Sequence, residues 1–263
     1  YNLETLKEDA RRHGIQALNP DINRSRAKCV IEDGALRLGF LNVLGLGGAS
    51  AEAIENTRKN SPFQSIGDFL ERTGVLEEIA LNLSGAGAFD SLETNRRKVK
   101  WEIGLRYRPI NSQLPLALPV EQDLVALDAP GDWERMKEEY NVLGLFPEGH
   151  IMSRLRHRFN GGFCTSRDID RLSDGAGVTA AGLVIRRQRP QGKVVYITLE
   201  DEFGHIPCMV FGKVYERYEH QFRSPFLIVK GRLTRREGTH NVVIQRVKPF
   251  SALDRVPPSK DFR

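Results

Sequence analysis

The clearest pattern of hydrophobic and polar positions lies between Gly177 and Phe250, where short apolar runs alternate with polar residues and end at turn signals. Such alternation predicts strands, because successive side chains of a strand point to opposite faces. We predict five strands, at Val178–Arg187, Lys193–Glu200, His205–Phe211, Phe226–Thr234 and Asn241–Val247. Between the third and the fourth, Lys213–Phe222 has the spacing of a helix.

Three strands, a helix and two strands in this order are typical of a small closed barrel. The five-stranded oligonucleotide/oligosaccharide-binding (OB) barrel is the common fold of that shape. Another small antiparallel sheet is the alternative.

One face of the second predicted strand presents an aromatic side chain. Val195, Ile197 and Leu199 share the core face, so Tyr196 and Thr198 share the other. The loops after the first and fourth strands are basic, and OB folds bind oligonucleotides with these loops and this face. The alternative is that the cations are solvated loop charges. The predicted contacts to single-stranded DNA are Arg186, Arg187, Arg189, Lys193, Tyr196, Thr198, Arg235 and Arg236.

A glycine-rich stretch, Val43–Ser50, precedes a helical pattern at Ala51–Lys59. Apolar-Gly-apolar-Gly before a helix is typical of a helix-hairpin-helix (HhH) motif, in which backbone amides and the helix dipole hold a phosphate. A purely structural turn is the alternative. The predicted contacts to duplex phosphates are Gly45, Leu46, Gly47, Gly48 and Ser50.

A second hairpin of the same kind lies at Ser84–Asp90, and a basic helix at Thr94–Tyr107 follows it. Two hairpins about forty residues apart resemble a tandem HhH unit. Phe89 directly follows the second hairpin's glycines, so we expect that hairpin to pack in the core rather than to hold phosphate. Arg96 and Arg97, at the start of the basic helix, are predicted to contact duplex DNA.

The composition excludes several classes of protein. No apolar run approaches the roughly 20 residues that span a bilayer, and the three cysteines have no partner at metal-ligand spacing. We therefore expect a reduced, cytoplasmic protein without membrane contact or a metal site. A net charge of +5 over 263 residues permits a nucleic-acid partner. Because the chain opens on Tyr1 rather than Met, we expect a fragment of a longer protein.

From Pro109 to Pro130 the chain is rich in proline and reads as a linker. Within it, Gln113, Leu114 and Leu116 resemble the short peptides with which bacterial polymerases bind the sliding clamp, although the usual terminal aromatic is missing. Plain anchoring of the linker is the alternative.

Taken in order, these features resemble the C-terminal third of bacterial family C DNA polymerases, the family of the DNA polymerase III alpha subunit. The stretches that carry the resemblance are Asp9–Ile15, Gly45–Gly47, Ser61–Phe63, Asp68–Arg72, Gly87–Asp90, Glu138–Tyr140 and Gly182–Pro190. Thr198–Gly204 and Ser259–Arg263 are most similar to the error-prone, damage-associated branch of the family.

The resemblance implies a multidomain α+β chain: an all-α region with tandem HhH motifs, followed by an all-β OB barrel. The expected domains are the end of the fingers at 1–34, the HhH domain at 35–108, a linker at 109–131, a helical connector at 132–174, the OB domain at 175–250 and a tail at 251–263. The family's catalytic palm and PHP domains are absent, so Mg²⁺ is expected only in the missing catalytic region.

The function implied is a non-catalytic, DNA-holding end of an error-prone polymerase, used in replication and damage-tolerant synthesis. Duplex and single-stranded template DNA are the expected partners, with the sliding clamp and accessory mutagenesis proteins as further ones. A protein-interaction module that recruits the polymerase is the alternative. An independent enzyme, such as a nuclease, lacks a catalytic constellation in this sequence.

Overall fold

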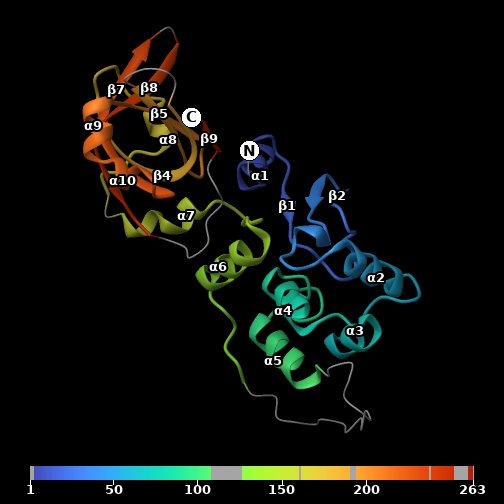
Figure 1. The fold of residues 1–263 in the computed structure, drawn as a ribbon. Helices are drawn as coiled ribbons and strands as arrows, with labels where there is room; N and C mark the ends of the chain where they lie inside the picture. The colour runs from blue at the N-terminus through green and yellow to red at the C-terminus, as the bar shows by residue number, and fades with distance from the viewer. Residues whose placement is uncertain are drawn as a thin grey trace. The chain divides into compact units, whose positions relative to one another are not determined.

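The computed structural model describes residues 3–107, 126–159, 161–189, 194–236, 238–251 and 260–262. The chain divides into two compact units, one formed by Arg11–Glu148 and the other by Tyr1–Ala10 with Gly149–Arg263 (Figure 1). Each has its own hydrophobic core. We call the first the helical unit and the second the barrel unit. No helix in the described ranges has the length and apolar character needed to cross a membrane.

The helical unit combines short helices with a small sheet. Most of α1 (Leu3–Arg12) belongs to the barrel unit, and in the helical unit a three-stranded sheet in the order β1-β3-β2 precedes the helices. The strands are β1 (Ala17–Leu18), β2 (Val30–Glu32) and β3 (Ala35–Arg37), and the helices are η1 (Phe40–Asn42), α2 (Gly48–Arg58), α3 (Ile66–Thr73), α4 (Glu77–Gly85), α5 (Arg96–Arg106) and α6 (Asp132–Leu143).

Local capping sets the bounds of α3. Ser65 accepts a hydrogen bond from the amide of Asp68 at the N-terminus, and Gly74 ends the helix in the left-handed conformation. Phe63 lies before the helix, and its amide donates to the side chain of Asn23. Its ring packs edge-on against Phe69 at 5.0 Å.

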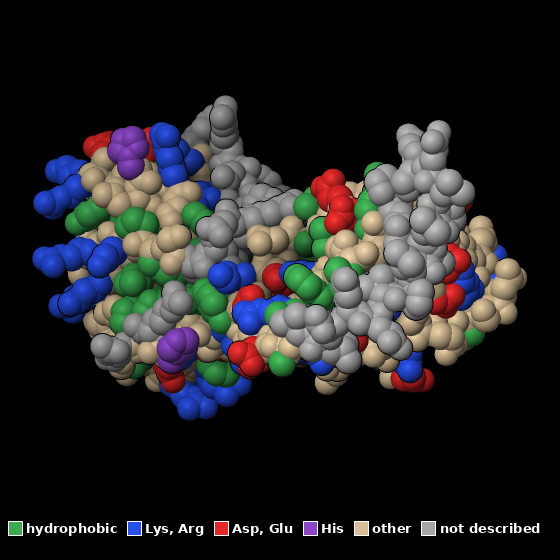
Figure 2. Space-filling view, turned by 90° about the horizontal axis from the view of Figure 1, so that it is seen from below, with side chains coloured by type: hydrophobic (Ala, Val, Ile, Leu, Met, Phe, Trp, Pro, Cys, Tyr) green, Lys and Arg blue, Asp and Glu red, His purple; other side chains and the backbone are tan. Residues whose placement is uncertain are grey.

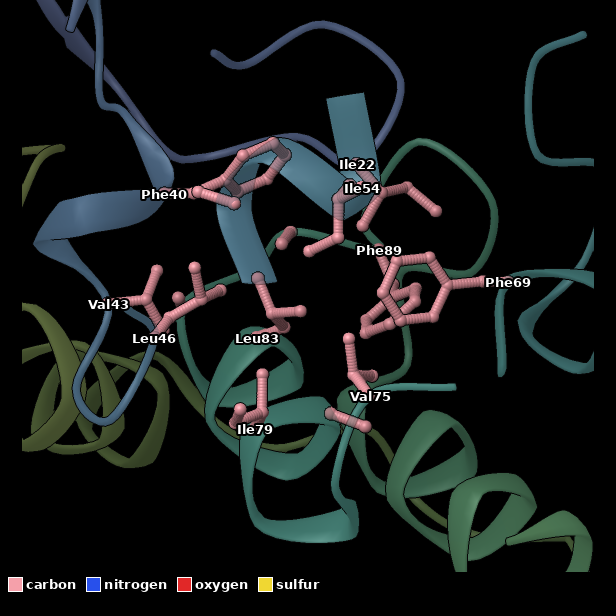
Figure 3. Packing of buried hydrophobic residues seen from close by; sticks show 14 of the residues in the cluster. Ile22, Phe40, Val43, Leu46, Ile54, Phe69, Val75, Ile79, Leu83 and Phe89 are labelled. Atoms are coloured by element: carbon pink, nitrogen blue, oxygen red, sulfur yellow. The ribbon is translucent and has the colours of Figure 1, made fainter. Parts of the chain in front are cut away.

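The core of the helical unit lies between the two hairpins. Phe69 stacks edge-on against Phe89, the residue that follows the glycines of the second hairpin. Val43 and Leu46 of the first hairpin point into the same cluster as Leu83 and Phe89 (Figure 3). The apolar positions of both hairpins are therefore used for packing, and their glycines are left to shape the backbone.

Besides the first part of α1, the barrel unit contains α7 (Ile151–Leu155), η2 (Arg156–Arg158) and α8 (Ser166–Ile169). The predicted strands then appear as β4 (Gly177–Gln188), β5 (Val194–Glu200), β6 (His205–Phe211), β7 (Phe226–Arg236) and β8 (Thr239–Pro249). The predicted single helix is two, α9 (Gly212–Arg217) and α10 (Glu219–Phe222), because Tyr218 between them leaves helical geometry. A short β9 (Lys260–Phe262), which sequence reasoning missed, pairs in parallel with β4.

Closure of the barrel depends on β4. The strands follow the order β5-β6-β8-β7-β4, and an additional pairing of β4 with β5 closes the ring. Residues 177–183 of β4 pair with β7, while residues 183–188 pair with β5. Gly182 lies at this change of partner, where a Cβ atom would come within 2.9 Å of the Glu200 carbonyl oxygen. A glycine is needed at this corner because the two backbones approach too closely for a side chain.

The division between the units falls inside the expected connector at 132–174. Helix α6 belongs to the helical unit, and residues from Gly149 onward belong to the barrel unit. Ion pairs between α5 and α6 explain the first assignment: Arg97 contacts Glu134 at 2.6 Å, and Lys100 contacts Glu138. The helical unit thus extends on both sides of the expected HhH domain at 35–108.

Candidate nucleic-acid interfaces

The first hairpin presents its backbone outward. Gly45 has φ +76°, a left-handed conformation that an L side chain resists. Val43 and Leu46 are buried, so the side chain of Leu46, a predicted DNA contact, is part of the core. Asn82 stabilises the hairpin, because its side-chain amide donates a hydrogen bond to the carbonyl of Leu44 at 3.0 Å.

The start of α2 offers a set of backbone donors. Gly47, Gly48 and Ala49 are exposed, and Gly47 caps the helix without a side chain. No acceptor among the described residues receives a hydrogen bond from the amides of these three residues. The first amides of a helix are oriented along its axis and carry the positive end of its dipole. They form an exposed donor set of the kind that binds a phosphate.

The second hairpin is closed from inside the protein. Gly87 has φ +80°, and a Cβ atom there would lie 2.4 Å from the Arg96 guanidinium and 2.8 Å from both Asn19 and Asp90. Ser84 to Phe89 are all buried. The expectation that this hairpin packs in the core, with Phe89 inside it, is confirmed.

Arg96 lies against Gly87 of the second hairpin. Its guanidinium is only 2% exposed and contacts Asp90 at 2.7 Å and Glu139 at 2.8 Å. Burial lowers the pKa of Arg96, but hydrogen bonds and charge from Asp90 and Glu139 outweigh this and raise it above its ordinary value. Burial also raises the pKa of Glu139, and Arg96 and Asn19 oppose that shift only in part. The prediction that Arg96 contacts DNA is corrected, since this side chain is buried.

Arg97 is exposed but has partners within the unit. It donates to Glu134 of α6 and to the carbonyl of Asp128. The two arginines therefore join α5 to the segment that contains α6. Their positive charge is neutralised inside the helical unit.

The outer face of the barrel carries the predicted aromatic. Val195, Ile197 and Leu199 of β5 are buried, while Tyr196 is 38% exposed. The register places Tyr196 opposite Met209 of β6, and Val194 opposite Phe211. Phe211, which is 50% exposed, is a second aromatic on this face that sequence reasoning missed, although the alternation in His205–Phe211 contains the signal. We call Tyr196, Thr198, Met209 and Phe211 the stacking face.

Two of the arginines predicted to contact single-stranded DNA form hydrogen bonds within the barrel unit. Arg187 donates to the carbonyls of Phe222 and Ser224, at the end of α10. Arg235 donates to the carbonyls of Ile169, Asp170 and Leu172, after α8. Both guanidinium groups thus stabilise helix ends of the barrel unit.

The remaining predicted cations have other surroundings. Arg186 pairs with Thr198 across β4 and β5, and Arg189 lies over the ring of Tyr215 at 5.3 Å. Arg236 is exposed at the end of β7. Lys193 lies outside the described residues, as do Gln113, Leu114 and Leu116 of the expected clamp peptide.

The adjacent carboxylates Asp201 and Glu202 have structural partners. Asp201 is buried and accepts hydrogen bonds from the amides of Phe203, Gly204 and Ser166. Glu202 forms a two-point ion pair with Arg156. Within the described ranges, no group of three or more His, Cys, Asp or Glu residues is arranged to hold a metal ion.

Two parts of the chain match the models of known domain families. Residues 14–99 match the family model of the helix-hairpin-helix motif, and residues 178–250 match that of an OB-fold nucleic acid binding domain. The chain therefore combines two domains whose families support nucleic-acid binding. The fold predicted from the sequence, an HhH region followed by an OB barrel, is confirmed.

Two longer proteins are similar to nearly the whole chain. The chain is 33% identical, over 95% of its length, to an error-prone DNA polymerase of Anaeromyxobacter sp. (strain K). It is 32% identical, over 96% of its length, to an error-prone DNA polymerase of Pseudomonas paraeruginosa. The chain is thus similar to the C-terminal part of two much longer proteins named error-prone DNA polymerase, and it spans 24% and 26% of their lengths.

A solved structure, the asparaginyl-tRNA synthetase of Pyrococcus horikoshii, is similar at 22% identity over 35% of this chain and 23% of its own, with a TM-score of 0.31. A likeness of this size carries no argument about function.

Proposed function

We propose that this chain is the DNA-holding region of an error-prone DNA polymerase. The observation that carries the proposal is the open donor set at Gly47, Gly48 and Ala49, whose amides have no acceptor among the described residues. Contacts of this kind hold a backbone phosphate without reading sequence. A polymerase must hold its duplex product in this way, because that product has every sequence in turn.

The barrel unit has exposed aromatic rings and cations that suit single-stranded DNA. Tyr196 and Phe211 are exposed on neighbouring strands, with Met209 between them on the same face. Bases of any identity stack on aromatic rings, so such a face suits single-stranded template. Arg186, Arg189 and Arg236 are the cations proposed to pair with its phosphates.

The duplex contact is tested by removing a single amide hydrogen. Proline is tolerated at the first position of a helix, and Gly47 before it has the extended conformation that a residue preceding proline prefers. Gly48→Pro therefore deletes one donor while keeping α2. We expect about tenfold weaker binding of a blunt duplex, since a hydrogen bond to a charged group contributes about 1.5 kcal/mol.

Gly48→Ala is the matched control. No atom lies within 4 Å of a Cβ added at Gly48, and alanine keeps the amide. It should bind duplex like the parent chain. Equal duplex affinity of the proline variant, with unchanged thermal unfolding, would show that the first hairpin holds no phosphate.

The template contact is tested with Tyr196→Ala and Tyr196→Phe. Loss of one stacked base lowers binding by roughly 1–3 kcal/mol, so the alanine variant should bind oligothymidylate at least fivefold more weakly. The phenylalanine variant keeps a ring and should match the parent. If the alanine variant bound oligothymidylate as tightly as the phenylalanine variant, stacking of bases on Tyr196 would be excluded.

The activity of the longer protein follows as a further part of the proposal. We propose that it polymerises DNA during damage-tolerant synthesis, with Mg²⁺ held in its catalytic region, and that Gln113, Leu114 and Leu116 recruit the sliding clamp. Replacing these three residues by alanine should abolish clamp binding and leave DNA binding intact. Retention of clamp binding would place recruitment elsewhere or in accessory proteins.

A further inference from the structure

Strands β7 and β8 carry a row of cations on the outside of the barrel. Along β7, Val229, Gly231 and Leu233 are buried, while Lys230 and Arg232 between them are exposed. Along β8, Arg246 and Lys248 are exposed on either side of buried Val247. We call Lys230, Arg232, Arg246 and Lys248 the basic strip. None of them is in the loops that sequence reasoning selected.

The register brings these charges together. Lys230 lies directly opposite Arg246, and Lys248 lies opposite Ile228 in the next outward pair. Side chains of directly opposite residues are about 5 Å apart at Cβ, and like charges in such a pair destabilise a sheet. The pair has no apparent structural benefit to the barrel.

Acidic residues are missing from the two strands that carry the strip. Strands β7 and β8 contain neither Asp nor Glu. In the described part of the chain, none of the four cations forms an ion pair with a carboxylate, and Arg232 donates only to the carbonyl of Gly175 at 3.3 Å. Exposed arginines elsewhere in the same unit differ: Arg223 pairs with Glu219. On the face of the barrel unit that Figure 2 shows, Lys and Arg side chains likewise lie beside hydrophobic ones.

The strip is continuous with the stacking face. Tyr196 lies opposite Met209, Met209 pairs with Val243, and Val243 lies opposite Arg232. This row of outward side chains crosses four neighbouring strands, from an aromatic ring at one end to a guanidinium at the other. The outward positions of β7 beside the strip are Ile228 and Thr234, and those of β8 are Asn241 and Val243, so no aromatic ring is available there.

We propose that the basic strip is a phosphate-binding surface that continues the template path beyond the stacking face. Bases of the single strand stack on Tyr196 and Phe211, and the adjoining nucleotides lay their phosphates along Lys230, Arg232, Arg246 and Lys248. Because no aromatic ring lies on these outward positions, we assign the strip to the phosphates of the single strand rather than to its bases. This inference rests on the proposed function, in which the barrel binds single-stranded template.

The test is the salt dependence of single-strand binding by the full chain. Each phosphate contact contributes about 0.7 to the slope of log affinity against log salt. The double variant Lys230→Gln with Arg246→Gln should lower that slope by about 0.7 for each cation removed, and weaken binding of oligothymidylate about fivefold or more at low salt. Its thermal stability should be unchanged or higher, because the like-charge pair is gone.

Arg223→Gln is the matched control, since it removes an exposed cation of the same unit that has a carboxylate partner. It should leave the slope unchanged. Tyr196→Ala should weaken binding without changing the slope, because stacking displaces no counterions. An oligodeoxynucleotide of abasic sites is the second probe: its binding should survive Tyr196→Ala and weaken in the double variant.

The outcomes separate the two proposals. If Tyr196→Ala weakens binding but the double variant keeps the parent slope, the basic strip holds no template and the proposed function stands. If neither variant affects single-strand binding, the assignment of template to the barrel fails, and the strip inference fails with it. A double variant that lost affinity for blunt duplex alone would overturn the inference by assigning the strip to duplex.

Discussion

The two hairpins of the helical unit share a glycine pattern and differ in what lies beside it. At the first, Gly45 is open, and the nearest atom to an added Cβ is 3.7 Å away, on Asn82. At the second, Gly87 is enclosed by Arg96, Asn19 and Asp90. The first therefore offers its amides to a ligand, and the second receives a cation from its own chain. A glycine hairpin is a site only where no neighbouring side chain occupies the concavity.

The largest effect that tests this comparison is expected from Arg96→Met. The variant leaves the buried carboxylate of Glu139 and the partly buried one of Asp90 without their cation. Breaking such a pair destabilises by roughly 3–5 kcal/mol. Urea unfolding followed by circular dichroism measures the change. A shift below about 1 kcal/mol would mean that the second hairpin does not depend on Arg96.

The same variant should depend on pH in a defined direction. Burial already raises the pKa of Glu139, and loss of Arg96 raises it further. A carboxyl whose folded pKa exceeds its unfolded value near 4.5 loses stability as pH rises through that window. The deficit of Arg96→Met relative to the parent should therefore shrink as pH falls from 7 to about 5. A deficit independent of pH would argue that Glu139 stays charged.

A matched pair of glycine substitutions compares the hairpins directly. Gly87→Ala combines left-handed strain with displacement of the Arg96 guanidinium, for which we expect about 3 kcal/mol of destabilisation. Gly45→Ala adds only the strain of about 1 kcal/mol, because its surroundings are open. Thermal unfolding of both variants at one pH gives the difference. Equal losses would contradict the contrast between an open and a closed hairpin.

The smallest effect is expected from Arg97→Ala. Its ion pair with Glu134 is at the surface, so its loss should change stability by less than about 1 kcal/mol. Because its charge is already neutralised, duplex affinity should change less than about twofold. A larger loss of duplex binding would contradict the contrast between the hairpins, because it would show that DNA also contacts the region of the second, closed hairpin.

The sequence was sufficient for elements whose signals are local. Period-two alternation located the five barrel strands, and Phe89 after the second pair of glycines indicated packing. The roles of single cations depended on partners far along the chain. Arg96 is neutralised by Glu139, and Arg187 donates hydrogen bonds to carbonyls at the end of α10; neither partner is visible in a local pattern. Phe211 could have been found from strand alternation, whereas the pairing of Lys230 with Arg246 needed the register across β7 and β8.

The closure of the barrel by β4 has a consequence for how the chain folds. One half of β4 pairs with β5, but the other half pairs with β7, which follows only after β6, α9 and α10. Such distant pairings form late, because the entropy of closing the intervening loop is lost before the contacts are gained. The barrel unit should therefore refold more slowly than the helical unit, and during synthesis β4 remains with an unpaired edge until β7 has been made.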